Sequence, residues 1–202
     1  MPSMILLNHM NIEIEIKVKI DNFDLLKKSL PGFGKLIKSI QQIDEYYTPC
    51  QRDFFAQKPH PVEWLRIRTN PDKIIFEYDR SIGKREDGSQ NYAQEYETEV
   101  KQPDEMRKIL EFLDFKKVTT VIKQREYWDC KNFEVVLDNV KDLGHFVEVE
   151  LKEDCSDGLI GRRKCMEFLE KLGIKITEND ITKTGYPVLL MESKKIIKPL
   201  KN

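Results

Sequence analysis

The chain has 202 residues, which is enough for one substantial hydrophobic core, and its composition does not require a second domain. Its 34 basic and 35 acidic residues nearly cancel, so the overall charge gives no support for nucleic acid as a partner. The apolar runs are far shorter than the roughly 18 residues that span a bilayer, so we expect a soluble, cytoplasmic protein without a membrane partner. The four cysteines form no CxxC pair, which argues against a zinc site or a disulfide framework.

The chain is expected to divide into three segments. Residues 1–11 are expected to form a leader that adds little to the fold, residues 12–192 a single folded domain, and residues 193–202 a basic tail.

Residues 12–20 read IEIEIKVKI, with an isoleucine or a valine at every even position and a glutamate or a lysine at every odd one. Side chains alternate across a strand, so this segment predicts a strand with one apolar face and one charged face. An antiparallel sheet with one face in water gives the same alternation. This strand alone therefore does not decide whether its charges lie in solvent or in an enclosed space.

A helix is expected after each of three acidic strands. The first follows the strand at 12–20, with Asn22 or Asp24 as its N-cap and Pro31 as its end. The second begins near Pro103, after an acidic strand that starts at Glu95, and the third follows the strand at 146–152. The apolar residues expected to face the core are Met106, Leu110 and Leu113 on the second helix and Met166, Leu169 and Leu172 on the third.

Two segments that follow the first two helices resemble each other. IQQIDEYY at 40–47 is similar to IKQREYW at 122–128. We interpret the pair as an internal duplication of a strand–helix–strand unit, and chance similarity between charged amphipathic segments is the alternative. Shorter strands are predicted at 64–69, 73–79 and 133–140, with a polar loop at 81–91. The last apolar segment is predicted to dock as a short helix that Tyr186 anchors.

The predicted strands repeat the one-faced charge pattern of the first strand. Arg66 and Arg68 share one face of their strand, for example, as Glu97 and Glu99 share one face of theirs. If these faces meet solvent, the arginines and glutamates form structural cross-strand salt bridges. If the sheet closes on itself, the charges converge inward. An unpaired buried ion costs several kcal/mol, so such a lumen requires a ligand.

The two kinds of charge suggest the chemistry of that ligand. Clustered carboxylates without histidine or cysteine suit hard divalent cations such as Mg²⁺ or Mn²⁺, which prefer oxygen ligands and are often shared with phosphates. Paired arginines and lysines suit phosphate oxygens. A polyphosphate bound with a divalent cation would neutralise both groups.

The ordered set of charged motifs resembles the CYTH superfamily, the triphosphate tunnel metalloenzymes. The motifs are ExExK at 13–17, LRIR at 65–68, EYETEV at 95–100, KQREY at 123–127, LDNVKDLGHFVEVE at 137–150 and TGYPVLLME at 184–192. The resemblance extends from residue 12 to about residue 192, so the expected folded domain is a CYTH tunnel domain. EYETEV and the LGxFVExE stretch are most similar to the class IV adenylyl cyclase branch.

The resemblance implies an α+β fold in which an eight-stranded antiparallel β-barrel forms an open tunnel, with helices packed on its outside. It also implies three sets of tunnel residues. The expected metal ligands are Glu13, Glu15, Glu97, Glu99, Glu148 and Glu150. The expected triphosphate-binding residues are Lys17, Arg66, Arg68, Lys123 and Arg125. The expected catalytic residues are Glu13, Glu15, Lys17, Lys123, Arg125 and Asp138.

One position departs from the family pattern. The family usually carries a lysine at the end of the fourth strand, in a motif like LTYK, where this chain reads FEYDR at 76–80. Asp79 occupies that place, or Arg80 substitutes for the lysine if the alignment shifts by one residue. The departure bears on how phosphate is held and therefore on the choice of substrate.

The function that the resemblance implies first is that of a class IV adenylyl cyclase, a phosphorus–oxygen lyase that converts ATP to cyclic AMP and pyrophosphate with Mg²⁺ or Mn²⁺. The first alternative is a triphosphatase that hydrolyses inorganic tripolyphosphate, thiamine triphosphate or a nucleoside triphosphate. The second is a binding module that holds polyphosphate or nucleotide without turnover. The same residues serve all three, so the motifs do not separate them, and a homodimer is an expectation from the resemblance alone.

Overall fold

The structure of the protein is a computed structural model, and it describes residues 14–57, 61–84, 90–153, 155 and 157–196. The expected leader and the end of the expected basic tail lie outside the described residues. Within the described ranges, no helix combines the length and the apolar character needed to cross a membrane.

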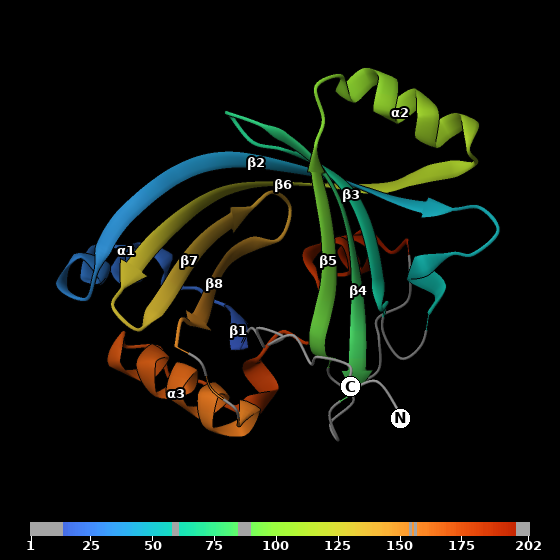
Figure 1. Cartoon of the computed structure of the whole chain (residues 1–202). Helices are drawn as coiled ribbons and strands as arrows, with labels where there is room; N and C mark the ends of the chain where they lie inside the picture. The colour runs from blue at the N-terminus through green and yellow to red at the C-terminus, as the bar shows by residue number, and fades with distance from the viewer. Residues whose placement is uncertain (1–13, 58–60, 85–89, 154, 156, 197–202) are drawn as a thin grey trace, which may run out of the picture.

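Eight strands form one antiparallel sheet, and four α-helices and three short 3₁₀ helices accompany it (Figure 1). The strands are β1 (Ile14–Lys19), β2 (Lys35–Pro49), β3 (Glu63–Thr69), β4 (Ile74–Lys84), β5 (Gln90–Glu99), β6 (Phe115–Cys130), β7 (Phe133–Val140) and β8 (Gly144–Leu151). The α-helices are α1 (Phe23–Ser29), α2 (Pro103–Phe112), α3 (Gly158–Lys171) and α4 (Tyr186–Ser193), and the 3₁₀ helices are Leu30–Gly32, Phe54–Ala56 and Glu178–Asp180.

The sheet bends into an arch but does not close. The strand order is β1-β8-β7-β6-β2-β3-β4-β5, so β1 and β5 are its two edges and do not pair with each other over the described residues. The long strands β2 and β6 arch across the molecule and join the β1–β8–β7 side to the β3–β4–β5 side (Figure 1). The predicted eight-stranded antiparallel sheet with an open tunnel is confirmed.

The topology agrees with an internal duplication. If the labels of β1 to β4 are exchanged with those of β5 to β8, the same strand order results, read in the opposite direction. In each half, one helix follows the first strand. The two similar sequence segments lie in β2 and β6, which pair with each other at the centre of the sheet. The third acidic strand with its helix, β8 with α3, ends the second half and does not begin another copy.

The outer face of the β1–β8–β7 side carries the main apolar core. Ile14, Ile16 and Val18 alternate along β1 with charged residues and are buried with side chains of α3 and α1. Burial of this stripe is the main driving force for docking α3, since each fully buried aliphatic side chain contributes about 1.5–3 kcal/mol. Gly161 allows α3 to approach closely, because a Cβ atom there would lie 2.5 Å from Cδ1 of Ile14.

A second apolar cluster fixes the C-terminal helix. Val188, Leu190 and Met191 of α4 are buried in a cluster that also contains Ile67 and Val121. The predicted short helix in the last apolar segment is therefore present, and its docking places the start of α4 beside the polar face of the sheet.

Two expectations from the sequence were wrong in detail. Leu113 was expected to face the core, but it follows the end of α2 and is 60% exposed, while Leu110 is buried. The polar segment 81–91 was expected to be a loop, but β4 continues to Lys84 and β5 begins at Gln90. Hairpin pairing supplies the backbone hydrogen bonds, so polar side chains did not prevent strand formation there.

Candidate functional site

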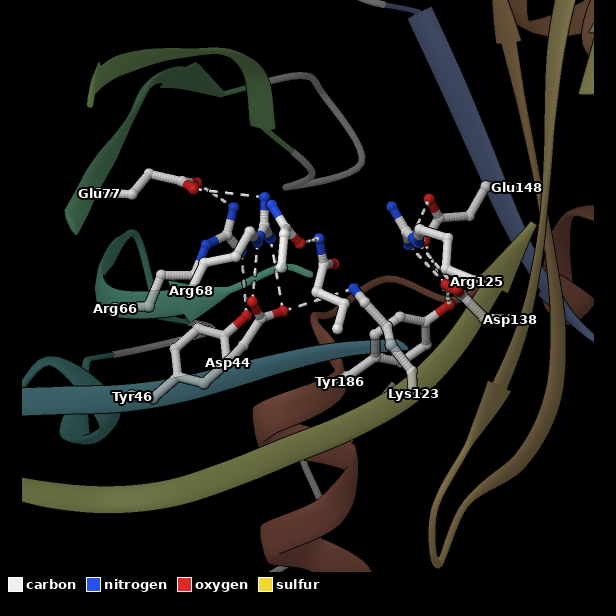
Figure 2. A network of polar contacts seen from close by, with 12 residues as sticks. Asp44, Tyr46, Arg66, Arg68, Glu77, Lys123, Arg125, Asp138, Glu148 and Tyr186 are labelled. Atoms are coloured by element: carbon white, nitrogen blue, oxygen red, sulfur yellow. Dashed lines mark hydrogen bonds and ion pairs between the residues drawn. The ribbon is translucent and has the colours of Figure 1, made fainter. Parts of the chain in front are cut away.

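The inner face of the arch carries charged side chains from most of its strands (Figure 2). Alternation along each strand fixes the face, and the register brings charged residues opposite each other. Lys17 lies opposite Glu148, and Arg66 lies opposite Glu77. Within the described residues, these side chains form two groups that Lys123 and Asp44 connect.

The first group lies on β1, β6, β7 and β8, and Arg125 is at its centre. Arg125 Nε donates to Oδ1 of Asp138 at 2.7 Å, and its terminal nitrogen lies 3.1 Å from both carboxylate oxygens of Glu148. Lys17 Nζ lies 2.9 Å from Oε1 of Glu148. Burial opposes the charge of Glu148, but Arg125 and Lys17 outweigh it and hold the pKa of this carboxyl below its usual range.

Tyr186 of α4 also enters the first group. Its hydroxyl donates to Oδ2 of Asp138 at 2.7 Å and lies 3.1 Å from Oε1 of Glu148. The Nζ atoms of Lys17 and Lys123 lie 4.7 and 5.2 Å from the centre of its ring. Burial, with Glu148 and Asp138 nearby, raises the pKa of the phenol, so Tyr186 remains a neutral hydrogen-bond donor.

The second group lies on β2, β3 and β4. Arg68 Nε donates to Oδ1 of Asp44 at 2.7 Å, and another of its nitrogens lies 3.3 Å from Oε2 of Glu77. Arg66 pairs with Glu77, lies 3.6 Å from Oδ2 of Asp79, and donates to the Tyr46 hydroxyl at 3.0 Å. Two arginines therefore face three carboxylates.

Lys123 connects the two groups and is almost completely buried. Its Nζ lies 3.4 Å from Oδ2 of Asp44. Burial and the neighbouring Arg125 lower the pKa of Lys123 to about 8, although Asp44 and Asp138 oppose this shift. A small change of environment is therefore enough to change the charge of this lysine near neutral pH.

Several buried polar atoms on the inner face have no hydrogen-bond partner among the residues that the structure describes. They are Oε1 of Gln42, Nε of Arg66, Oε2 of Glu77 and Oδ1 of Asp79. Buried polar groups in folded proteins are nearly always paired, so these atoms offer hydrogen-bonding positions to a polar ligand or to water.

A cluster of carboxylates on the inner face could hold a divalent cation. Oxygen atoms of Glu77, Asp79 and Glu95 lie within 4.8 Å of one another. On the opposite side of the arch, Glu15 lies directly opposite Glu150 across β1 and β8. Like charges opposite each other are unfavourable, and oxygen ligands suit Mg²⁺ and Mn²⁺, so both sets of donors fit a hard divalent cation.

The structure brings most of the predicted site residues to the inner face. The contacts described above join the following predicted residues on this face: Lys17, Arg66, Arg68, Lys123, Arg125, Asp138 and Glu148. Of the other predicted metal ligands, Glu13 lies outside the described residues, Glu15 is exposed and Glu150 is half-buried. Glu97 and Glu99 are exposed on β5, with Glu97 opposite Glu77.

The sequence did not predict the positions in the site of Asp44, Tyr46, Glu77, Glu95 and Tyr186. Asp44 and Tyr46 share a face of β2, which is the signal that could have identified them. The departure from the family pattern lies in the middle of β4, which continues to Lys84. Asp79 lies on the inner face near Arg66, whereas its neighbour Arg80 is exposed.

The CYTH domain model matches residues 11–184 of the chain. A protein of Methanocaldococcus jannaschii with the name "Putative adenylate cyclase MJ0240" is 32% identical over 177 residues, which cover 87% of this chain and 96% of that protein.

Solved structures share the fold. The PH1012 protein of Pyrococcus horikoshii superimposes with a TM-score of 0.70 at 25% identity, covering 88% of this chain and 99% of that one. A protein of Hippeastrum with the name "Putative adenylyl cyclase HpAC1" superimposes with a TM-score of 0.62 at 17% identity. A dominant triphosphatase activity is described for that protein. That alignment covers 96% of this chain and all of the other, and at this identity it shows the fold alone.

Proposed function

Since the chain belongs to the CYTH domain family, we propose that it is a divalent-metal-dependent enzyme that acts on a triphosphate substrate in the tunnel. Our first assignment within this class is an adenylyl cyclase that converts ATP to cyclic AMP and pyrophosphate. The name of the M. jannaschii relative, which is similar over nearly its whole length, supports this choice.

The observation that carries the proposal is the concentration of five basic side chains on one enclosed face. Lys17, Arg66, Arg68, Lys123 and Arg125 are all at most 18% exposed in their side chains. Each is at present balanced by a carboxylate. A phosphate chain offers the same oxygen acceptors, so it can replace these carboxylates as hydrogen-bond partners of the arginines and lysines.

The divalent cation would be held by carboxylates of the inner face. By the family pattern these are Glu13, Glu15, Glu148 and Glu150, with Glu97 and Glu99 nearby. When bound, Mg²⁺ or Mn²⁺ would neutralise phosphate charge and polarise the phosphoryl group.

The protein's own contribution to a cyclase reaction is binding and orientation. The basic residues would hold the β- and γ-phosphates and stabilise the charge that develops on the leaving pyrophosphate. Asp138 accepts hydrogen bonds from Arg125 and Tyr186, so it would fix the guanidinium in position. The 3′-hydroxyl of the ribose would attack the α-phosphate, and its proton would pass to a carboxylate of the tunnel or to solvent.

A triphosphatase is the second candidate. The same residues would present the terminal phosphate to water, and the activity described for the Hippeastrum protein shows that this fold accommodates that reaction. A binding module without turnover is the third candidate, and the acidic residue at position 79 supports it because it weakens the phosphate-binding end of the tunnel.

A product assay, together with calorimetry, separates the three candidates. The purified protein is incubated with ATP and either Mg²⁺ or Mn²⁺, and cyclic AMP, pyrophosphate and orthophosphate are measured. We expect cyclic AMP and pyrophosphate in equal amounts from the wild type and neither from Arg125→Met. Orthophosphate without cyclic AMP would instead assign a triphosphatase, and calorimetric binding of ATP without any product would assign a binding module.

A further inference from the structure

Asp79 lies in β4, where the pairing with β5 brings acidic residues opposite each other. In one half, Lys17 lies opposite Glu148 and Glu15 lies opposite Glu150. In the other half, Glu97 lies opposite Glu77 and Glu95 lies opposite Asp79. At these positions the β1–β8 pair contains a lysine, whereas the β4–β5 pair contains only acidic residues.

The two groups of the inner face differ in their balance of charges. In the first group, Lys17 and Arg125 are paired with two carboxylates, Asp138 and Glu148, and Lys123 lies at its border, where it pairs with Asp44 of the second group. The second group consists of two arginines and the carboxylates of Asp44, Glu77 and Asp79. A phosphate chain is therefore attracted to the first group more strongly than to the second.

The surroundings of Asp79 show that negative charge is already in excess there. Carboxylate oxygens of Asp79, Glu77 and Glu95 lie within 4.8 Å of one another, and Oδ2 of Asp79 lies 3.6 Å from a nitrogen of Arg66. Within the described part of the chain, Nε of Arg66, Oε2 of Glu77 and Oδ1 of Asp79 have no hydrogen-bond partner. The guanidinium of Arg66 is thus surrounded by carboxylates without being fully satisfied by them.

We propose that Asp79 is a specificity-determining residue that opposes the binding of phosphate at Arg66, so the tunnel gains little affinity from a third phosphate group. The inference rests on the proposed function, because it assumes that the inner face binds a phosphate chain. At one end of the phosphate chain, the carboxylate of Asp79 repels phosphate where a lysine would attract it. Lys17, Lys123 and Arg125 then hold most of the phosphate charge.

Calorimetry with pyrophosphate and tripolyphosphate tests the proposal directly. Both are titrated into the full chain at pH 8 with EDTA present, so that no divalent cation contributes. We expect the wild type to bind tripolyphosphate less than about 3-fold more tightly than pyrophosphate, and Asp79→Asn to raise this preference to about 10-fold or more, since 1.4 kcal/mol corresponds to tenfold. The gain is expected in the tripolyphosphate affinity.

Asp72→Asn is the matched control, because Asp72 is exposed in the turn between β3 and β4 and its substitution changes the net charge equally. We expect it to leave the preference unchanged. Circular dichroism checks folding, and Asp79→Ser gives the same loss of charge if Asp79→Asn does not fold. An unchanged preference in folded Asp79 variants, or a wild type that already prefers tripolyphosphate tenfold, would refute the role of Asp79. A wild type that binds neither anion with EDTA would refute this inference, and one that also binds neither anion when Mg²⁺ replaces the EDTA would overturn the proposed function.

Discussion

The hydroxyl of Tyr186, on the last helix, donates a hydrogen bond to Asp138 at 2.7 Å, on a strand in the middle of the sheet. Both residues are buried, and Asp138 also accepts from Arg125. The C-terminal helix therefore takes part in the polar network of the tunnel as well as in an apolar cluster.

Replacing Tyr186 by phenylalanine should weaken both stability and function. The change removes the donor to a buried carboxylate, which costs about 1–3 kcal/mol, and frees Asp138 to move with Arg125. Urea unfolding measures the loss of stability. A lower affinity for tripolyphosphate would show that the guanidinium of Arg125 is no longer held in position. Tyr96→Phe is the control, because Tyr96 is 61% exposed and its substitution should change neither quantity.

Replacement by alanine should lower the stability of the protein at one glutamate of the predicted metal site and leave it nearly unchanged at another. Glu148 is buried between Lys17 and Arg125, so Glu148→Ala should destabilise the protein by about 3–5 kcal/mol. Glu15 is exposed, so Glu15→Ala should change the free energy of unfolding by less than about 0.5 kcal/mol.

Metal-dependent turnover of Glu15→Ala should nevertheless fall more than about 100-fold, since even residues that only support metal ligands cost 10- to 100-fold. The measurement is product formation from ATP over a range of Mg²⁺ and Mn²⁺ concentrations. Full turnover in Glu15→Ala would show that Glu15 is not a metal ligand.

Lys123 should make the protein more stable as the pH rises from about 8 towards 10.5. Its folded pKa of about 8 lies below the ordinary 10.5, so in this interval the unfolded chain holds a proton that the folded chain has lost. Lys123→Met should remove this rise, which is on the order of 1–3 kcal/mol. Urea unfolding at pH 7.5 and 9.5 measures it, with exposed Lys116→Met on the same strand as control. A rise that survives in Lys123→Met would contradict the assignment.

The same titration should affect phosphate binding. Below pH 8 the charged Lys123 attracts phosphate, whereas above that pH the neutral amine does not, so the affinity for pyrophosphate should fall as the pH rises through 8. The pH dependence of Lys123→Met should be flatter over the same interval.

Gly34 should not tolerate a side chain. It precedes β2, and a Cβ atom there would lie 2.2 Å from the backbone oxygen of Asp129 and 2.6 Å from the sulfur of Cys130. Because a backbone atom cannot move aside easily, Gly34→Ala should cost about 1–3 kcal/mol, as overpacking usually does. Gly32→Ala is the control, since nothing lies within 4 Å of its added carbon, and thermal unfolding of both variants gives the comparison. Equal melting temperatures of the two variants would show that β6 moves away from Gly34 without any loss of stability.

The positions of Asp44 and Asp79 show what the sequence could not predict, namely which of two adjacent charged residues faces inward. Asp44 is followed by Glu45, and neighbouring residues in a strand point to opposite faces. Asp44 points inward to Arg68, while Glu45 pairs with Arg107 on the outside. Two adjacent acids by themselves do not show which of them faces inward, and the same ambiguity applied to the neighbours Asp79 and Arg80.

The alternation of residues 12–20 determined that one face of β1 is apolar and the other charged, because a strand repeats every two residues whatever surrounds it. The order of the charged motifs, through its likeness to a family, determined the eight-stranded open tunnel. Only the tertiary structure decided which charges meet. Lys17 reaches Glu148 and Tyr186 reaches Asp138 through the pairing of distant strands and the docking of a helix, and these contacts follow from packing of the whole chain, which no local pattern encodes.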